Sequence, residues 1–304
     1  MVFFRLKCLT AALGLLFFAW LEGQNYDRYT LSNGFAHNDY LQRHPLMESY
    51  ALGFGLIEVD LCWNGGELMV AHEKETVREG RTFNRLYLEP LARLWKEGKA
   101  RPVSFLVDLK TSWQETLPEV VRAIEAYPEF GDQVTWVISG DRPPKEKFSE
   151  YPSFIKFDGK LGETYRPEEL AKVALFSEDF RLYSSWNGKG QPKAQEQHRI
   201  RQAVSWAHDK GKPIRFWGTP DEINAWHGLM GYDVDYISTD QPAALAAVLE
   251  RMGKSSYRSR IAPVLFSKEE RVWRKEGKKC YFVYCGRGFF ASALCGLYGE
   301  RRAS

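Results

Sequence analysis

Short apolar runs bounded by turn residues recur along the chain and alternate with longer amphipathic stretches. Eight of these runs predict strands, at 34–37, 56–62, 103–109, 134–139, 154–157, 173–176, 214–217 and 236–238. Apolar residues between them repeat with helical spacing, for example over 117–124 and 200–207. The alternation predicts an α/β protein with a TIM (β/α)8 barrel, and a doubly wound sheet is the alternative. No G-x-G-x-x-G loop follows the first strand, which weakens the dinucleotide-binding form of that alternative.

A tight turn is predicted directly after the second strand. Asn64, Gly65 and Gly66 tolerate positive φ and stand between two apolar runs. We therefore expect residues 56–71 to form a strand, a turn and a returning strand.

The first residues have the layout of a signal peptide. Arg5 and Lys7 precede an apolar run over 8–21, and a polar segment begins at Glu22. Because this run is shorter than the roughly 20 residues that span a bilayer, an uncleaved anchor is the weaker interpretation. We expect residues 1–23 to be removed and the protein to be exported, either to a periplasm or outside the cell. Residues 24–252 are then the barrel domain.

The 304 residues, 44% hydrophobic and 27% charged, provide for a sizeable core and exclude a disordered chain. The formal net charge of +3 is too small to indicate a nucleic-acid partner. The basic excess lies in residues 253–304, which carry 12 Lys and Arg against four Asp and Glu. We interpret this segment as an appended, partly disordered tail. Its composition permits peripheral contact with an anionic membrane surface, and it fits a dispensable solvated extension equally well.

Four cysteines follow the signal segment, and three of them, Cys280, Cys285 and Cys295, lie in the tail. Their spacing does not match a zinc-ligand pattern, so loose or tail-internal disulfides are favoured over a metal. Cys62 ends an apolar run and is interpreted as a small buried residue.

Polar side chains end several of the predicted strands. His37 ends the first strand, Glu58 and Asp60 lie in the second, His72 follows the returning strand and Asp108 is near the end of the third. In a TIM barrel such residues point into the site at the carboxyl ends of the strands. The sequence therefore predicts that two histidines and three carboxylates converge.

The three carboxylates suit a hard cation. Glu58 and Asp60 lie two positions apart, so their side chains share a face and repel unless a cation separates them or one is protonated. With a third carboxylate and no cysteine, the expected cation is Ca2+ or Mg2+. His37 and His72 are then candidates for the general base and acid, because imidazole exchanges protons near neutral pH. Lys110 places a positive charge near an anionic substrate.

Each of these residues also has a structural explanation. An E-x-D pair taken alone more often marks a solvated face, and a single histidine at a strand end more often makes a structural hydrogen bond. The solvated alternative is weaker here because Leu56, Ile57 and Val59 indicate a buried strand. No role is assigned to the remaining histidines, at 44, 198, 208 and 227.

The order of these motifs resembles the PI-PLC-like phosphodiesterase superfamily, which contains glycerophosphodiester phosphodiesterases and phosphatidylinositol-specific phospholipases C. The resemblance covers residues 34–242. It rests on Ala-His37-Asn, Gly-Leu-Ile-Glu58-Val-Asp60-Leu, Val-Ala-His72, Val-Asp108-Leu-Lys110, Phe-Trp217-Gly-Thr-Pro-Asp221 and Asp235-Tyr-Ile-Ser-Thr-Asp240-Gln-Pro. The local form Ala-His37-Asn38-Asp39-Tyr40 is most similar to the branch named after the yeast altered inheritance of mitochondria protein 6.

The resemblance implies a barrel of that phosphodiesterase type and a role for each motif. His37 and His72 correspond to the acid/base pair, and Glu58 and Asp60 to metal ligands. Asp108 stands where the family usually has the Glu of an E-x-K motif, and it still supplies a carboxylate. Lys110 matches the Lys of that motif.

Two further positions carry over from the family. Trp217 falls where the family has a tryptophan lining the substrate cleft, and core packing is the alternative. Asp240 falls in a T-D-x-P motif, and we expect it to be the N-cap of the following helix.

One departure from the family concerns the first strand, where the partner of the histidine is Asn38 instead of Arg. An amide can hydrogen-bond a substrate phosphate but cannot neutralise it. Arg78, Arg81 or Arg215 could compensate, and each could equally be a surface charge.

These residues predict a metal-dependent phosphoric diester hydrolase. Its substrate would be a small-molecule glycerophosphodiester or a phospholipid head group, and no protein partner is predicted. The alternative is a non-catalytic barrel that binds a lipid head group or an anionic surface. Glycoside hydrolysis is weaker because the strand ends Ser139-Gly140 and Trp217-Gly218 lack a second catalytic glutamate.

Overall fold

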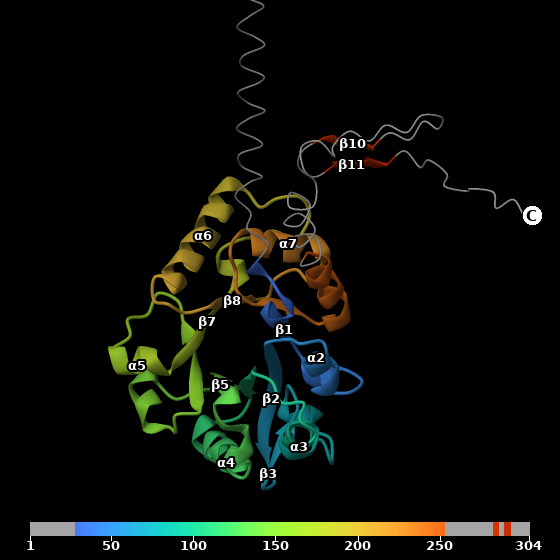
Figure 1. The fold of residues 1–304 in the computed structure, drawn as a ribbon. Helices are drawn as coiled ribbons and strands as arrows, with labels where there is room; N and C mark the ends of the chain where they lie inside the picture. The colour runs from blue at the N-terminus through green and yellow to red at the C-terminus, as the bar shows by residue number, and fades with distance from the viewer. Residues whose placement is uncertain (1–27, 253–281, 286–288, 293–304) are drawn as a thin grey trace, which may run out of the picture. The chain divides into compact units, whose positions relative to one another are not determined.

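The computed structural model of the protein describes residues 28–252, 282–285 and 289–292 (Figure 1). The predicted signal peptide, residues 1–23, lies outside the described residues. So does most of the tail, including Cys280 and Cys295, and with it the predictions of tail disulfides and partial disorder.

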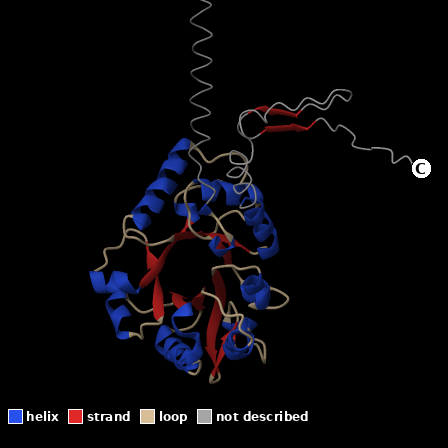
Figure 2. Cartoon of the chain, viewed as in Figure 1, coloured by secondary structure: helices blue, strands red, loops and turns tan. Residues whose placement is uncertain are grey.

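Eight parallel strands form a ring, and the helices of residues 28–252 lie outside it (Figure 2). The strands are β1 (Gly34–Ala36), β2 (Leu56–Asn64), β4 (Val103–Leu109), β5 (Val134–Gly140), β6 (Ile155–Lys160), β7 (Val173–Asp179), β8 (Ile214–Trp217) and β9 (Ile237–Thr239). The helices are α2 (Met47–Ala51), α3 (Glu89–Lys96), α4 (Trp113–Glu125), α5 (Pro167–Lys172), α6 (Ala194–His208), α7 (Ile223–Gly231) and a last helix over 242–252.

Hydrogen bonds join the strands in the order β8-β7-β6-β5-β4-β2-β1-β9. The ring closes between its two ends, where Arg215 of β8 bridges Tyr236 in parallel and the Tyr236 amide donates to the Ile214 carbonyl. The predicted TIM barrel is therefore confirmed, and the doubly wound alternative is wrong.

The predicted turn and returning strand are also present. β3 (Glu67–Val70) pairs antiparallel with β2, and Gly65 and Gly66 between them have φ of 62° and 91°. These are left-handed conformations that glycine adopts without a steric penalty. Cys62 on β2 is fully buried, as expected, and it forms no disulfide with another described residue.

Alternate residues of each strand face two different cores. The larger core lies between the strands and the helices and contains Ile57, Val59 and Phe105. A smaller cluster of Phe35, Leu56, Leu106, Val137 and Leu175 comes from the opposite strand faces and fills the barrel interior. The side chains that follow these residues toward the carboxyl ends are polar, which is where the candidate site lies.

Several strands extend beyond the apolar runs that predicted them. β6 ends at Lys160 and β7 at Asp179, three residues past each predicted end. Polar residues such as Asp158 and Ser177 continue these strands because they point into the polar end of the barrel and not into an apolar core. No helix among residues 28–252 is long and apolar enough to cross a membrane.

The chain divides into two units after Met252. In the second unit, β10 (Phe282–Cys285) pairs antiparallel with β11 (Phe289–Ser292), with Phe282 opposite Ser292. This pairing was not predicted from the sequence.

Candidate active site

The parallel register brings the predicted polar residues to one end of the barrel. Ala36 of β1 pairs with Ile57 of β2, so His37 follows at the level of Glu58. Asp60 of β2 pairs directly with Asp108 of β4. Residues from different motifs therefore meet because their strands are neighbours.

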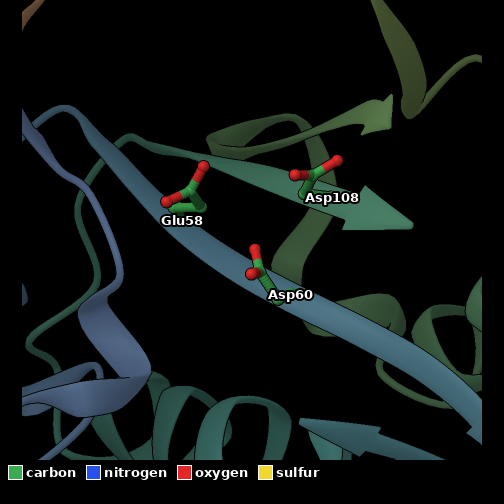
Figure 3. A group of neighbouring side chains, drawn as sticks. All are labelled: Glu58, Asp60 and Asp108. Atoms are coloured by element: carbon green, nitrogen blue, oxygen red, sulfur yellow. The ribbon is translucent and has the colours of Figure 1, made fainter. Parts of the chain in front are cut away.

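Glu58, Asp60 and Asp108 form a carboxylate triad whose ligand atoms lie within 4.8 Å of one another (Figure 3). Glu58 and Asp60 are buried, with 4% and 1% of their surfaces exposed, and Asp108 is half-buried. Burial raises the pKa of Glu58, and the charge of Asp60 raises it further, against the opposing effects of His37 and Arg215. The raised pKa means that the charged form of Glu58 is disfavoured unless a positive charge compensates it.

Two oxygens of the triad lack a partner. Oδ1 of Asp60 and Oδ1 of Asp108 are buried without a hydrogen-bond donor among the described residues. Such atoms are costly unless a ligand or ion satisfies them. Gly140 keeps the space beside Asp108 open, because a Cβ at this position would lie 2.1 Å from Asp108 Oδ1. Three carboxylates, two of them with an unpartnered oxygen, fit a hard divalent cation.

Lys110 lies against the triad. Its Nζ is 2.6 Å from Oδ2 of Asp108 and 3.3 Å from Oδ2 of Asp60. Burial lowers the pKa of this ammonium, but the two carboxylates outweigh it and the pKa is raised overall. The side chain therefore stays charged and partly compensates the triad.

A second ion pair lies deeper in the barrel, where Arg215 is buried. Its Nε donates to Ser177 Oγ at 2.7 Å, and its Nη2 is 3.8 Å from Oδ2 of the buried Asp158. Burial raises the pKa of Asp158, against the opposing charges of Arg215 and Arg142.

His37 lies between two carboxylates. Its Nδ1 is 2.7 Å from Oδ1 of Asp240, and its Nε2 is 3.6 Å from Oε2 of Glu58. Burial lowers the pKa of His37, yet the hydrogen bond with Asp240 and the charge of Glu58 raise it overall. The same bond lowers the pKa of Asp240.

The expected N-cap role of Asp240 is wrong. In the helix over 242–252, the Gln241 carbonyl accepts from the amides of Ala244 and Leu245, so the helix begins one residue later than expected. The Asp240 carboxylate contacts His37 and Asn38 instead. The signal available in the sequence was that Asp240 follows the last strand, as the other polar residues follow theirs.

His72 forms the second histidine–carboxylate pair. Its Nδ1 is 2.8 Å from Oδ2 of Asp60, while 61% of its side chain is exposed. Tyr40 Oη donates to the same oxygen at 2.9 Å. Tyr40 was not predicted as a site residue, because nothing in its loop distinguishes a site tyrosine from a packing tyrosine.

Asn38 connects these groups from a left-handed backbone conformation with φ of 50°. Its amide N–H donates to Glu58 Oε2 at 2.8 Å, its Nδ2 donates to Asp240 Oδ1 and its Oδ1 accepts from Tyr40. Asparagine tolerates this conformation better than most residues.

Trp217 is apart from this hydrogen-bonded group. It ends β8 on the same side of the barrel, with 39% of its surface exposed and the Arg181 guanidinium 5.2 Å from the ring centre. Its exposure excludes the alternative of core packing.

A cleft of about 530 Å3 opens beside the site. The site residues Asn38, Tyr40 and His72 line it, together with Arg78 and Arg81. The volume is within the range of small-molecule sites, roughly 300–1,000 Å3.

Residues 30–101 match the model of the AIM6-like phosphodiesterase domain. The chain is 24% identical to altered inheritance of mitochondria protein 6 of Eremothecium gossypii, over 69% of this chain and 68% of that protein. It is 23% identical to the homolog from Arthroderma benhamiae, over 61% of this chain and 72% of that protein. These matches confirm the resemblance to this branch of the phosphodiesterase superfamily.

Among solved structures, the chain is similar to a glycerophosphodiester phosphodiesterase from Parabacteroides distasonis. The TM-score is 0.46 at 13% identity, and the match covers 73% of this chain and 95% of that one.

Proposed function

Starting from the likeness to the AIM6-like phosphodiesterase domain, we propose that the protein is a metal-dependent phosphoric diester hydrolase. The observation that carries the proposal is the pairing of each histidine with a carboxylate around the buried triad. The matched residues 30–101 contain His37, Glu58, Asp60 and His72. The substrate is a small-molecule glycerophosphodiester or a phospholipid head group.

Glu58, Asp60 and Asp108 would hold the cation, Ca2+ or Mg2+. Both ions prefer oxygen ligands, and the unpartnered oxygens of Asp60 and Asp108 provide them. When bound, such a cation supplies charge stabilisation to a phosphate oxygen. Lys110 adds a fixed positive charge beside the same oxygens.

His37 and His72 exchange the two protons that diester cleavage requires. One ring takes the proton of the attacking water or of a neighbouring substrate hydroxyl. The other ring protonates the leaving alcohol. Asp240 and Asp60 each accept from Nδ1 of their histidine, which leaves Nε2 of that ring for the substrate. Asn38 and Trp217 are proposed substrate contacts at the two sides of the barrel mouth.

Hydrolysis of bis(p-nitrophenyl) phosphate tests the proposal. His37→Ala and His72→Ala should each reduce turnover by at least about 100-fold, the lower bound for general acid–base catalysis. The matched control is His208→Ala, because His208 also pairs with a carboxylate, Asp235 at 2.8 Å, but lies outside the site. Near-normal rates in either site variant would reject the assignment of His37 and His72.

Exposed apolar side chains around the barrel mouth support a membrane-derived substrate. Leu41, Leu182, Trp217 and Ile223 are all large, exposed residues that end or follow β1, β7 or β8. We name these four residues the apolar rim. Apolar side chains in this position favour peripheral contact with a lipid surface. If no diester is cleaved but lipid binding persists, the protein is the non-catalytic lipid-binding barrel.

Export through cleavage of residues 1–23 is proposed from the sequence pattern alone. Mass spectrometry of the protein isolated from its natural host tests it, since a chain that retains Met1 would exclude cleavage.

A further inference from the structure

The cleft beside the active site is lined by hydrogen-bond donors and apolar side chains, with no aspartate or glutamate among the residues that line it. Its charged residues are Arg78 and Arg81, and Gln42 and Thr76 add polar groups. The positive charge of this lining contrasts with the negative charge of the neighbouring carboxylate triad. A cleft of this character favours an anionic group.

The two arginines lack carboxylate partners. Arg78 makes no hydrogen bond or ion pair with any other described residue through its side chain, which is exposed at the cleft. Arg81 is half-buried, and its guanidinium donates to the Tyr40 carbonyl. Neither charge is neutralised by the protein, so both are free to bind an anion.

The backbone fixes both arginines relative to the site. The Arg81 carbonyl accepts from the Val70 amide of β3 at 2.8 Å, and the Arg81 amide donates to the Arg78 carbonyl at 3.2 Å. The loop that carries them is thus attached to the strand that ends beside His72. The backbone of both arginines is therefore held in place, and the Arg78 side chain is left to adjust to a ligand.

The cleft and the triad are different places. Tyr40 and His72 line the cleft and contact Asp60, but Asp60, Glu58 and Asp108 do not line it. The scissile phosphate must contact the triad's cation and the histidines. Arg78 and Arg81 line the same cleft as His72, so the alcohol portion that extends from the scissile phosphate past His72 would lie beside them.

We propose that Arg78 and Arg81 form a subsite for a second phosphate group, carried by the alcohol portion of the diester on the His72 side. The inference rests on the proposed function, because that function places the scissile phosphate at the triad. A phosphate monoester matches the two guanidinium groups because it is dianionic and presents several acceptor oxygens. The substrate class is thus a diester of a phosphorylated alcohol, either free or as a lipid head group.

Calorimetric titration of the full chain with two matched ligands tests the subsite without turnover. The ligands are propane-1,3-diol bisphosphate and propyl phosphate, which differ by one phosphate. The wild type should bind the bisphosphate at least about tenfold more tightly, the effect of one or more hydrogen bonds to a charged group. Arg78→Gln and Arg81→Gln should each reduce this preference, whereas Arg85→Gln, on the same segment but outside the cleft, should keep it.

A second experiment tests whether the second phosphate belongs to a free molecule or to a lipid head group. Sedimentation is compared for vesicles containing phosphatidic acid, a phosphate monoester, and vesicles containing phosphatidylglycerol, a diester. A preference in either arm that Arg78→Gln reduces supports the subsite and identifies its source. Because Arg81→Gln also removes a contact to Tyr40, Arg81→Lys serves as the second variant, and it should retain part of the preference.

Equal binding of both ligands in both arms, or a preference unchanged by Arg78→Gln together with Arg81→Lys, would overturn the inference. Turnover of bis(p-nitrophenyl) phosphate with no second-phosphate preference would reject the subsite but not the hydrolase. A preference without turnover of any diester would reject the hydrolase and leave an anion-binding cleft.

Discussion

The carboxylate of Asp240 lies 2.7 Å from Nδ1 of His37, although 203 positions separate the two residues in the chain. The contact exists because β9 pairs with β1, with Thr239 beside Ala36. His37 thus follows one strand and Asp240 the neighbouring strand. The bond fixes the orientation of the ring and raises the pKa of His37 against the lowering effect of burial.

Asp240→Asn should lower the pKa of His37, because the amide carries no negative charge. Whether His37 is the acid or the base, the limb of the pH–rate profile that reports it should move to lower pH. We expect turnover to fall by at least about tenfold, because the ring also loses the partner that orients it. The pH dependence of kcat/KM, together with an NMR titration of His37, measures the change.

Asp235→Asn is the matched control for this prediction. It breaks the pair of Asp235 with His208, which has a separation of 2.8 Å and lies outside the site. Equal effects of Asp240→Asn and Asp235→Asn on the pH–rate profile would show that Asp240 acts through stability alone.

The strands of the barrel could be predicted from the sequence because each begins with an apolar run that must be buried. The ends were predicted less well where the strand continues with residues that face the polar interior, as at Asp158. The pairing of β10 with β11 was missed because its two segments lie within a charged tail. Apolar runs in the sequence predict that a strand is present, but they do not predict where its polar end lies.

The site residues that could be predicted from the sequence are those that lie at the end of a predicted strand. The triad and both histidines were found because each ends an apolar run, and parallel strands bring such ends together. The contact of Asp240 with His37 was missed because a helix follows Asp240, and an N-cap is the simplest local explanation. Tyr40 was missed because its bond to Asp60 depends on the path of a loop.

Lys110→Met should destabilise the metal-free protein by about 2 kcal/mol, less than for a fully buried ion pair because 19% of the Lys110 and of the Asp108 side chain is exposed. The ammonium and a divalent cation are attracted to the same oxygens of Asp60 and Asp108, so the variant should also bind the cation more tightly. Chemical denaturation with and without Ca2+ measures both effects. A variant with wild-type stability and weaker cation binding would contradict the competition between lysine and cation.

Asp39→Asn should gain stability relative to the wild type as pH rises. Asp39 is fully buried and bonded to Ser49, Leu46 and Tyr87, and burial raises its pKa above the ordinary value of 3.8. A raised pKa means that the wild type loses stability as pH rises through the folded-state value, and asparagine cannot lose a proton. Between about pH 4 and about pH 7, the free energy of unfolding of the variant, measured by denaturation, should rise relative to that of the wild type. If the difference in unfolding free energy between the two proteins does not change with pH, the pKa of Asp39 is not raised.

Replacing the exposed residues Leu182 and Ile223 of the apolar rim by serine should weaken binding to lipid vesicles. Each side chain is more than half exposed, at 65% and 58%, so neither change opens a cavity in the core. The double variant should bind vesicles at least about tenfold more weakly, given the free energy of burying two apolar side chains. Turnover of a soluble diester separates this effect from loss of catalysis, and unchanged sedimentation would exclude the apolar rim as a membrane contact.

The most direct test of the account is the dependence of diester hydrolysis on a cation held by the triad. The protein is treated with chelator, assayed on bis(p-nitrophenyl) phosphate, and assayed again after Ca2+ or Mg2+ is restored, with Glu58→Gln in parallel. The account predicts that turnover disappears with the metal, returns with one of the two ions and stays absent in the variant. Turnover that survives chelation, or that the restored cation supports equally in Glu58→Gln, would contradict it.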